Sequence, residues 1–334
     1  MSIKIIQAGL FSTIQDIGRI GYQHIGFSGA GAMDVNSFRL AQIMIGNEGP
    51  AIEYTMIGPT IQFNEANTFV LCGAYGDSLL NNQAISHQTV YFVDKGDILT
   101  IGPLSHGTRG YITFGKPLDI PKVANSYSTH TRTAIGGYKG RTLQKNDMIN
   151  VRHNNKYKIN LGKHADMNLL PQDKLIHIIE GPQINEFSTK TIETLTQQSY
   201  VISEQSDRMG YRLIGEGVAP INNADIISEP VALGSIQVPN DGQPIILLND
   251  KQTIGGYTKI ATVCKFDLPK LAQMKPNDDI KFKWLDFEVA KKINDKLEND
   301  FEINIKTMKD KPTYDMTALR QTSQKISKML QGAN

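Results

Sequence analysis

The segment 234–257 holds a dense group of polar side chains that could bind a small molecule. Its sequence, GSIQVPNDGQPIILLNDKQTIGGY, predicts a strand, a turn at residues 240–242 and a returning strand. Such a hairpin would gather the polar residues near one sheet surface: Gln237, Gln243, Asp250, Gln252 and Tyr257. Amides, a carboxylate and a phenol together suit an amide or ureido ligand, which needs both donors and acceptors. A hairpin with merely solvated polar residues is the competing interpretation, and the pattern alone leaves both open.

Two arginines are candidates for binding an anion. Arg208 lies in SDRMGYR (206–212) and Arg19 in QDIGR (15–19). A guanidinium binds carboxylate or phosphate through paired hydrogen bonds. The aspartates beside both arginines make internal ion pairs the more common explanation. Lys251 and Lys259 are possible phosphate contacts, although most lysines are only solvated.

A glycine-rich segment, GFSGAGAMD (26–34), precedes a predicted helix and has the pattern G-x-G-x-x-D. In a dinucleotide-binding loop a small residue would stand where Asp34 stands. Asp34 would also place a negative charge at the helix end where a phosphate would bind. The segment therefore predicts a tight turn with Asp34 as the N-cap. If it has a ligand, we expect one that donates a hydrogen bond to Asp34, such as an amide N–H.

Bulk properties exclude several classes of function. The 334 residues carry a net charge of +2 and 20% charged residues, so nothing indicates nucleic-acid binding. No phosphate-binding P-loop and no metal-ligand spacing occurs among the histidines or the two cysteines, so no metal site is predicted. No apolar run approaches the ~20 residues of a membrane span. These features are typical of a cytoplasmic protein without a membrane partner.

Short strands make up most of the elements that must position these residues. The predicted strands are 2–7, 67–73, 88–94, 97–101, 109–114, 174–180, 199–203, 244–249 and 278–285. Helices are fewer, and they are predicted at 35–45, within 183–198, at 268–273, at 287–300 and at 318–332. Frequent short strands without regular intervening helices favour barrels or sandwiches over a parallel sheet.

A weak internal echo indicates two related β domains. The tetrapeptide 19–22 (RIGY) is matched by 208–211 (RMGY), and each is followed downstream by Gly-Gly-Tyr. The order repeats although the spacing does not, and chance recurrence is a competing explanation. We predict one β domain over 1–160, a second over 161–290 and a charged helical tail over 291–334.

Taken in order, the motifs resemble a known family. They are TIQDIGRIGY (13–22), GFSGAGAMD (26–34), IGN (45–47), Glu53, SDRMGYRL (206–213), the 234–257 segment and KFDLPKLAQMKPNDDIKF (265–282). This set is similar to the 5-oxoprolinase C-subunit family, also called allophanate hydrolase subunit 2, Kip antagonist protein or the carboxyltransferase domain of urea carboxylase. The resemblance extends to about residue 290. It implies a mainly β fold of tandem cyclophilin-like β-barrels, with a few helices and a helical C-terminal tail.

The resemblance also implies a function in a complex. Together with two partner subunits, one of the A type and one of the Kip inhibitor-like B type, the chain is expected to open 5-oxo-L-proline to L-glutamate. ATP is the implied co-substrate, with Mg²⁺ as its counter-ion, and the resemblance leaves open whether this chain or the whole complex binds it. Two alternatives stay open: a carboxyltransferase acting on urea or a related amide with a separate carboxybiotin carrier, and a regulatory module that binds a kinase inhibitor.

Carried onto this sequence, the resemblance assigns roles to individual residues. Arg208 is expected to bind anionic oxygens, and Asp250 to share the catalytic role with it. Gln237, Asp250 and Gln252 are expected to bind the lactam or ureido edge, with Tyr257 as a wall or donor. Gln243, Asp34 and Arg19 complete the predicted substrate-binding set.

Overall fold

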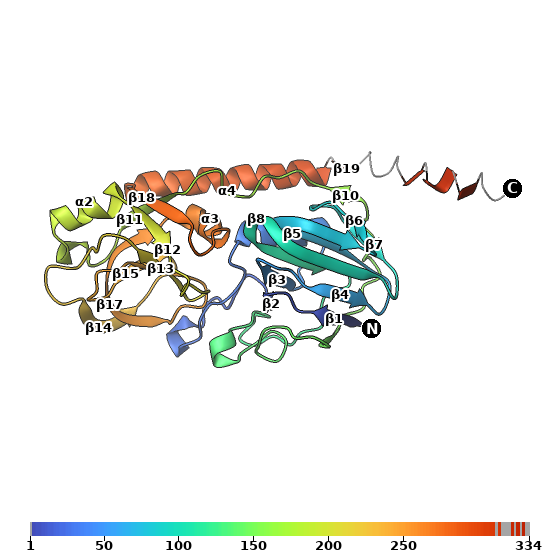
Figure 1. The fold of residues 1–334 in the computed structure, drawn as a ribbon, viewed down its shortest axis with the longest axis horizontal. Helices are drawn as coiled ribbons and strands as arrows, with labels where there is room; N and C mark the ends of the chain where they lie inside the picture. The colour runs from blue at the N-terminus through green and yellow to red at the C-terminus, as the bar shows by residue number, and fades with distance from the viewer. Residues whose placement is uncertain (1, 311–312, 315–321, 324, 328, 331–334) are drawn as a thin grey trace.

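Two β-rich halves lie side by side in the computed structural model, and one long helix runs along both of them (Figure 1). The structure describes residues 2–310, 313–314, 322–323, 325–327 and 329–330. The N-terminal half contains a nine-stranded sheet and the C-terminal half an eight-stranded sheet.

The first sheet is antiparallel and has the order β2-β3-β8-β4-β1-β9, with β5 joining β8 to β6 and β7. Its strands are β1 (Ser2–Gln7), β2 (Phe11–Gln15), β3 (Ala51–Thr55), β4 (Thr60–Phe63), β5 (Asn67–Leu80), β6 (Gln83–Ala84), β7 (Tyr91–Val93), β8 (Ile98–Phe114) and β9 (Met148–Asn150). Alternating apolar residues of these strands form one buried core.

One prediction for this sheet is wrong. The sequence predicted separate strands at 97–101 and 109–114, because Pro103 and Gly107 between them are typical of turns. The structure instead has the single long strand β8, paired with β5 along its length. The pairing shifts register at several points between Gly73 and Ser78. These irregularities accommodate the turn-type residues without ending the strand.

The second sheet closes into a barrel. Its strands are β11 (Leu175–Glu180), β12 (Ser199–Ile202), β13 (Gly210–Ile214), β14 (Asp225–Pro230), β15 (Ser235–Val238), β16 (Ile245–Leu247), β17 (Ile254–Val263) and β18 (Asp279–Trp284). The order is β11-β18-β12-β13-β16-β15-β17-β14, and an additional pairing of β11 with β17 closes a ring of seven strands. The predicted mainly β fold is thus confirmed as a half-barrel sheet followed by a closed barrel. The predicted domain limits at residues 160 and 290 stay a prediction.

Helix α1 (Val35–Ile45) packs against β5 of the first sheet. Its predicted bounds are confirmed: the Asp34 side chain accepts a hydrogen bond from the Ser37 N–H at 3.1 Å, and Gly46 ends the helix at φ 82°. α2 (Thr189–Gln197) and α3 (Leu268–Ala272) lie within the predicted ranges 183–198 and 268–273. Short 3-10 turns occur at η1 (Gln23–Ile25), η2 (Thr131–Thr133), η3 (Ile184–Glu186) and η4 (Lys265–Asp267).

Helix α4 (Phe287–Asp310) is longer than the predicted 287–300 and lies along both halves (Figure 1). Its last turns pack Phe301, Ile305 and Met308 into a core cluster with residues of α1 and β5. Arg39 of α1 lies over the Phe301 ring, 4.6 Å from its centroid. The extra length therefore comes from contacts with the first half. The helix predicted at 318–332 falls largely outside the described residues. Before it, the short strand β19 (Thr313–Tyr314) pairs with β10 (Lys163–His164).

Replacing Ile305 by alanine tests this packing. The Ile305 side chain is 2% exposed, so Ile305→Ala should lower the free energy of unfolding by about 2–3 kcal/mol through lost burial and a residual cavity. Ile303 is on the same helix but is 53% exposed, so Ile303→Ala should change the free energy of unfolding by less than about 0.5 kcal/mol. Urea denaturation of both variants measures the difference, and equal losses would contradict the docking of α4.

Candidate functional site

A cavity of about 390 Å³ lies where loops of both halves meet. Its wall is built from the loop before and after η1, the η2 turn, and the chain that follows β16. The lining residues are Arg19, Ile25, Gly26, Phe27, Ser28, His130, Arg132, Thr133, Ile135, Met209, Asp250, Lys251, Gln252, Thr253 and Ile254. The volume is in the range of small-molecule sites.

Three predicted site residues meet in this cavity: Arg19, Asp250 and Gln252. Arg19 comes from the first half, and the other two come from the turn between β16 and β17. The backbone of that turn is fixed, because Asp250 N–H donates to the Arg208 carbonyl at 2.9 Å. Motifs more than 200 residues apart in the sequence, 15–19 and 249–252, therefore line the same cavity.

Arg208 is buried beside this cavity and is largely occupied by the protein itself. Its Nε and Nη2 donate to the two carboxylate oxygens of Asp250 at 3.0 and 2.9 Å. Nη2 also donates to the Gly31 carbonyl at 2.7 Å, and Nη1 donates to Glu53. Burial alone would lower the pKa of Arg208, but the charges of Asp250 and Glu53 more than offset this and raise it. These contacts occupy Arg208 with carboxylates of the protein, and its predicted contact with anionic oxygens of a substrate stays a prediction.

Arg19 has the opposite environment. Its side chain is 1% exposed, yet its Nε and Nη1 have no hydrogen-bond partner among the described residues, and only Nη2 donates, to the Ser128 carbonyl. Burial is the main effect and lowers the pKa of Arg19, while the charges of Asp16 and Asp250 partly oppose it. Buried polar groups without partners are rare in folded proteins and indicate a missing partner.

The nearby Asp16 does not supply that partner. Its Oδ1 accepts from the hydroxyls of Ser126 and Ser128, both at 2.6 Å, and its Oδ2 accepts from the Tyr127 N–H at 2.7 Å. Oδ1 also accepts from the Gly18 N–H at 2.9 Å. The internal ion pair that the adjacent aspartate suggested is therefore absent from the hydrogen bonds and ion pairs that the structure describes for Arg19.

Three other predicted residues do not line the cavity. Gln243 instead binds the backbone of Gly215, accepting from its N–H at 3.1 Å and donating to its carbonyl at 3.2 Å. Ile236 and Val238 point into the barrel core, so Gln237 points to the opposite face, where its amide lies against Gly255. Tyr257 lies on β17 opposite Asp225. The hairpin does not gather all five polar residues, because Asp250 and Gln252 follow β16 and Gln243 lies in the turn before it. Gln237 and Tyr257 lie on the barrel strands β15 and β17.

The glycine-rich loop is built as a junction between the halves. Its backbone N–H groups are taken by protein acceptors at 2.7–3.1 Å: Ala30 by Asn249 O, Gly31 by Gln15 Oε1, Ala32 by Asp16 O, Met33 by Glu53 Oε2 and Asp34 by Tyr111 Oη. A phosphate would find none of these amides available. The interpretation as a turn with an N-cap is supported, and a phosphate cradle is not.

Asp34 receives the amide hydrogen bond that we expected from a ligand, but from the protein. Its Oδ2 accepts from Nε2 of Gln273, a residue of the second half, at 2.6 Å. The Asp34 carboxylate is fully buried, and burial raises its pKa although hydrogen bonds from Ser37 and Gln273 oppose the shift. Asp34 therefore belongs to the contact between the halves and lies outside the cavity lining.

Two further cavity residues were not predicted as a site. His130 has Nδ1 2.6 Å from Thr133 Oγ1 and Nε2 3.1 Å from the Asp250 carbonyl oxygen, so it joins the two walls. Lys251 is buried, its Nζ donates to the Gln252 carbonyl at 3.2 Å, and burial lowers its pKa. No sequence spacing identifies His130, whereas Lys251 stands inside the 234–257 motif and was considered only as a possible phosphate contact.

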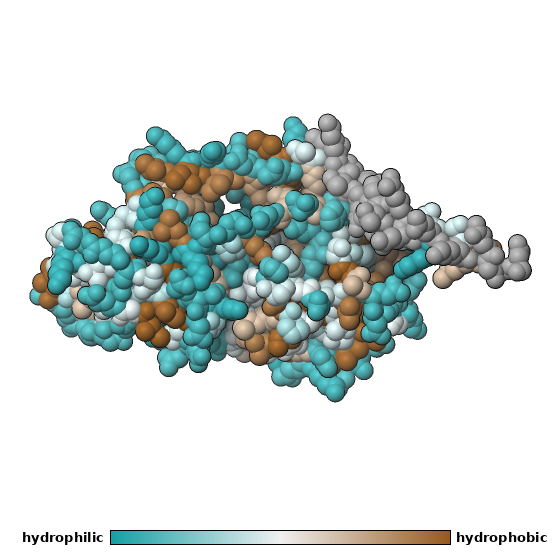
Figure 2. All heavy atoms as spheres, turned by 45° about the horizontal axis from the view of Figure 1, so that its top comes forward, coloured by the Kyte–Doolittle hydropathy of each residue, from teal (hydrophilic) through white to brown (hydrophobic). Residues whose placement is uncertain are grey.

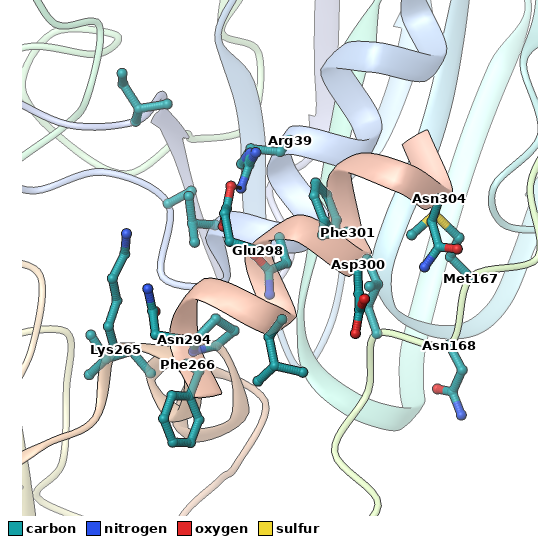
Figure 3. A pocket seen from close by; sticks show the side chains of 18 of the residues that line it. Arg39, Met167, Asn168, Lys265, Phe266, Asn294, Glu298, Asp300, Phe301 and Asn304 are labelled. Atoms are coloured by element: carbon teal, nitrogen blue, oxygen red, sulfur yellow. Dashed lines mark ion pairs between the residues drawn. The ribbon is translucent and has the colours of Figure 1, made fainter. Parts of the chain in front are cut away.

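A larger cavity, of about 980 Å³, lies between α4, α1 and η4. Figure 2 shows the surface hollowed beneath α4, and Figure 3 shows Arg39 and Glu298 facing each other across this space. Arg39 Nη1 pairs with Glu298 at 2.7 Å, and its Nη2 pairs with Glu302. Two carboxylates of α4 thus occupy Arg39, and the cavity holds none of the predicted site residues, so it is the weaker candidate for a ligand site.

The fold and the junction site define a member of the carboxyltransferase-domain class. Residues 25–284 match the family model described as carboxyltransferase domain, subdomain A and B. The chain belongs to this family. Among curated relatives, it is 33% identical to the C subunit of 5-oxoprolinase from Escherichia coli (strain K12), over 90% of this chain and 96% of that protein. The corresponding protein of Haemophilus influenzae is 34% identical, over 89% of this chain and 95% of that protein.

A second group of relatives is much longer. Urea amidolyase of Saccharomyces cerevisiae is 33% identical over 88% of this chain but only 17% of its own length. The solved K. lactis urea amidolyase superposes with a TM-score of 0.81 at 26% identity, over 91% of this chain and 20% of that one. This chain thus spans about a fifth of that solved protein. Within the residues that the structure describes, there is no helix with the length and apolar character needed to cross a membrane.

Proposed function

We propose that this chain is the C subunit of an ATP-dependent 5-oxoprolinase complex, which cleaves 5-oxo-L-proline to L-glutamate with ATP hydrolysis. The observation that carries the proposal is the extent of the match. The relationship to the 5-oxoprolinase protein of E. coli spans 90% of this chain and 96% of the relative, whereas the match to yeast urea amidolyase spans 17% of that enzyme. The proposal includes an A-type partner and a Kip inhibitor-like B-type partner, in the cytoplasm.

Within the complex, we assign this chain the binding and orientation of the lactam. Arg208 uses one hydrogen bond on each oxygen of Asp250, which leaves each oxygen able to accept another. The lactam N–H is a suitable donor to Asp250, and the Gln252 amide offers a donor to the ring carbonyl. A carboxylate held by two bonds from a buried arginine keeps one orientation, and such positioning is a main part of catalysis.

ATP is proposed as a co-substrate of the complex, with Mg²⁺ as its counter-ion. The glycine-rich loop of this chain does not fit its phosphates, because the loop amides 30–34 are bonded to the protein. We therefore assign nucleotide binding to the assembled complex and not to this loop.

Carboxyl transfer to urea or a related amide is the second candidate function. The family model and the solved K. lactis urea carboxylase, which has a TM-score of 0.79 and 27% identity, favour it. A carrier protein with carboxybiotin would have to supply the carboxyl group.

An assay of the complex reconstituted with its A-type and B-type partners tests the proposal. We expect glutamate and phosphate to form from 5-oxo-L-proline and ATP, and the Gln252→Ala variant to lower kcat/KM about tenfold because a hydrogen bond to substrate is lost. Gln205→Ala, an exposed glutamine outside the cavity lining, is the matched control and should match the wild type.

Each contrary outcome of this assay has a distinct meaning. No glutamate from the complete complex contradicts the proposal. Turnover of urea that requires a biotinylated carrier would assign the chain to carboxyl transfer instead. Tight binding to the B-type partner without any turnover would identify a regulatory module of the Kip antagonist type.

A further inference from the structure

Two buried cations line the cavity without an ion pair among the described residues. Its buried ionisable lining groups include Arg19, Lys251 and Asp250. Asp250 is already paired with Arg208 from outside the lining. Among the described residues, Arg19 has no ion pair within 4.0 Å, and Lys251 donates only to a backbone carbonyl. Two cations therefore line the cavity without a hydrogen-bonded carboxylate, while the charges of Asp16 and Asp250 act on Arg19 from nearby.

Arg19 is the better placed of these two cations to bind an anion. Its unpaired Nε and Nη1 hydrogens are held in a fixed plane by the bond from Nη2 to Ser128. A planar guanidinium with adjacent donors matches a carboxylate, which presents two oxygens in one plane. Water is largely excluded from the side chain, so a bound anion would face little competition from solvent.

The rest of the lining favours a carboxylate on an apolar molecule over a phosphate. Apolar side chains contribute much of the wall: Ile25, Phe27, Ile135, Met209 and Ile254. Phosphate sites are typically made by several backbone N–H groups, and those of residues 30–34 in the adjacent glycine-rich loop are already bonded. Methylene groups of a saturated ring would bury apolar surface against these side chains.

We propose that Arg19 binds the carboxylate of the cyclic amide substrate and that this contact selects carboxylate-bearing lactams over urea. The proposal rests on the proposed function, because 5-oxo-L-proline is the substrate considered. Arg19 and the Asp250–Gln252 turn lie on walls from different halves, so a molecule that bridges them must carry an acidic group and an amide. Urea has an amide but no carboxylate and no apolar surface.

The test compares 5-oxo-L-proline with 2-pyrrolidinone, the same lactam without the carboxylate. Binding to the wild-type chain is measured by isothermal titration calorimetry, and turnover is measured in the reconstituted complex. The wild type should prefer 5-oxo-L-proline by about 10- to 100-fold, the effect of one charge-assisted hydrogen-bonded pair. Arg19→Gln should remove that preference by weakening 5-oxo-L-proline binding and leave 2-pyrrolidinone within about threefold of the wild type.

Arg212→Gln is the matched control. Arg212 lies on β13, is exposed and is outside the cavity lining. This variant should keep the wild-type preference. Arg19→Lys retains the charge without the planar pair of donors, and it should recover only part of the preference.

Several outcomes would overturn the inference. Equal binding of both lactams by the wild-type chain would contradict the inference. This comparison needs no variant, so it holds even where Arg19→Gln fails to fold. An equal loss for both lactams in Arg19→Gln would make Arg19 structural only. Stronger competition by inorganic phosphate than by 5-oxo-L-proline would assign the cavity to a phosphate group. If the complex lacks turnover but the chain still shows Arg19-dependent preference for the carboxylate, the proposed function fails and the carboxylate site stands.

Discussion

Arg208→Met is expected to lower the free energy of unfolding by about 3–5 kcal/mol. The substitution keeps a side chain of similar length but leaves Glu53 and Asp250 buried without their counter-charge, at 1% and 4% exposure. It also frees the Gly31 carbonyl. The pKa of Arg208 is raised in the folded state, so its contribution to the free energy of unfolding is present at every pH below roughly 12. This contribution should be constant between about pH 6 and 9. Urea denaturation at several pH values measures both the loss of unfolding free energy and its dependence on pH.

Two controls separate charge from packing in this experiment. Arg132→Met removes an exposed pair and should cost less than about 0.5 kcal/mol. Combining Arg208→Met with Glu53→Gln and Asp250→Asn should recover about 2 kcal/mol, because no uncompensated carboxylate then remains. If Arg208→Met loses less than about 1 kcal/mol but abolishes turnover, Arg208 contacts substrate directly, as the sequence predicted.

Local signals in the sequence predicted elements well where neighbouring residues determine them. Helix 35–45 was predicted to the residue, because its start depends on Asp34 and its end on Gly46, both adjacent in the chain. β8 and α4 were predicted too short. Their continuation depends on partners distant in sequence, namely β5 for β8 and α1 for the last turns of α4. No local pattern contains that information.

At the site, too, local signals predicted some residues, whereas contacts between residues distant in sequence were not predicted. Residue type and motif predicted Arg19, Asp250 and Gln252, and the fold brings them together. Neighbouring aspartates indicated which carboxylate each arginine would contact, and the structure differs. Arg208 pairs with Glu53, 155 positions away, and with Asp250, 42 positions away. The pairing with Glu53 depends on how the two halves meet, and the pairing with Asp250 depends on how β13 and β16 lie together in the barrel. A single sequence expresses neither.

The contact between the halves is polar and buried, and Gln273 makes several of its hydrogen bonds. Its Oε1 accepts from the N–H groups of Thr108 and Arg109 at 2.9 and 3.1 Å. Its Nε2 donates to Asp34 at 2.6 Å and to the Arg109 carbonyl at 2.9 Å. Arg109 in turn donates to Tyr211 and to the Ala272 carbonyl, both at 2.7 Å. Because the cavity takes walls from both halves, these bonds also set its shape.

Gln273→Leu should therefore lower the free energy of unfolding by about 3 kcal/mol or more, since it leaves several buried polar groups without partners. Gln273→Glu, of the same size, should cost at least as much, because an oxygen would then face the Asp34 carboxylate at the position of Nε2. The exposed Gln205→Leu should change stability by less than about 0.5 kcal/mol. Denaturation curves and the affinity for 5-oxo-L-proline should fall together in both Gln273 variants. A loss below about 1 kcal/mol would mean that apolar packing, and not this hydrogen-bonded contact, holds the halves in register around the cavity.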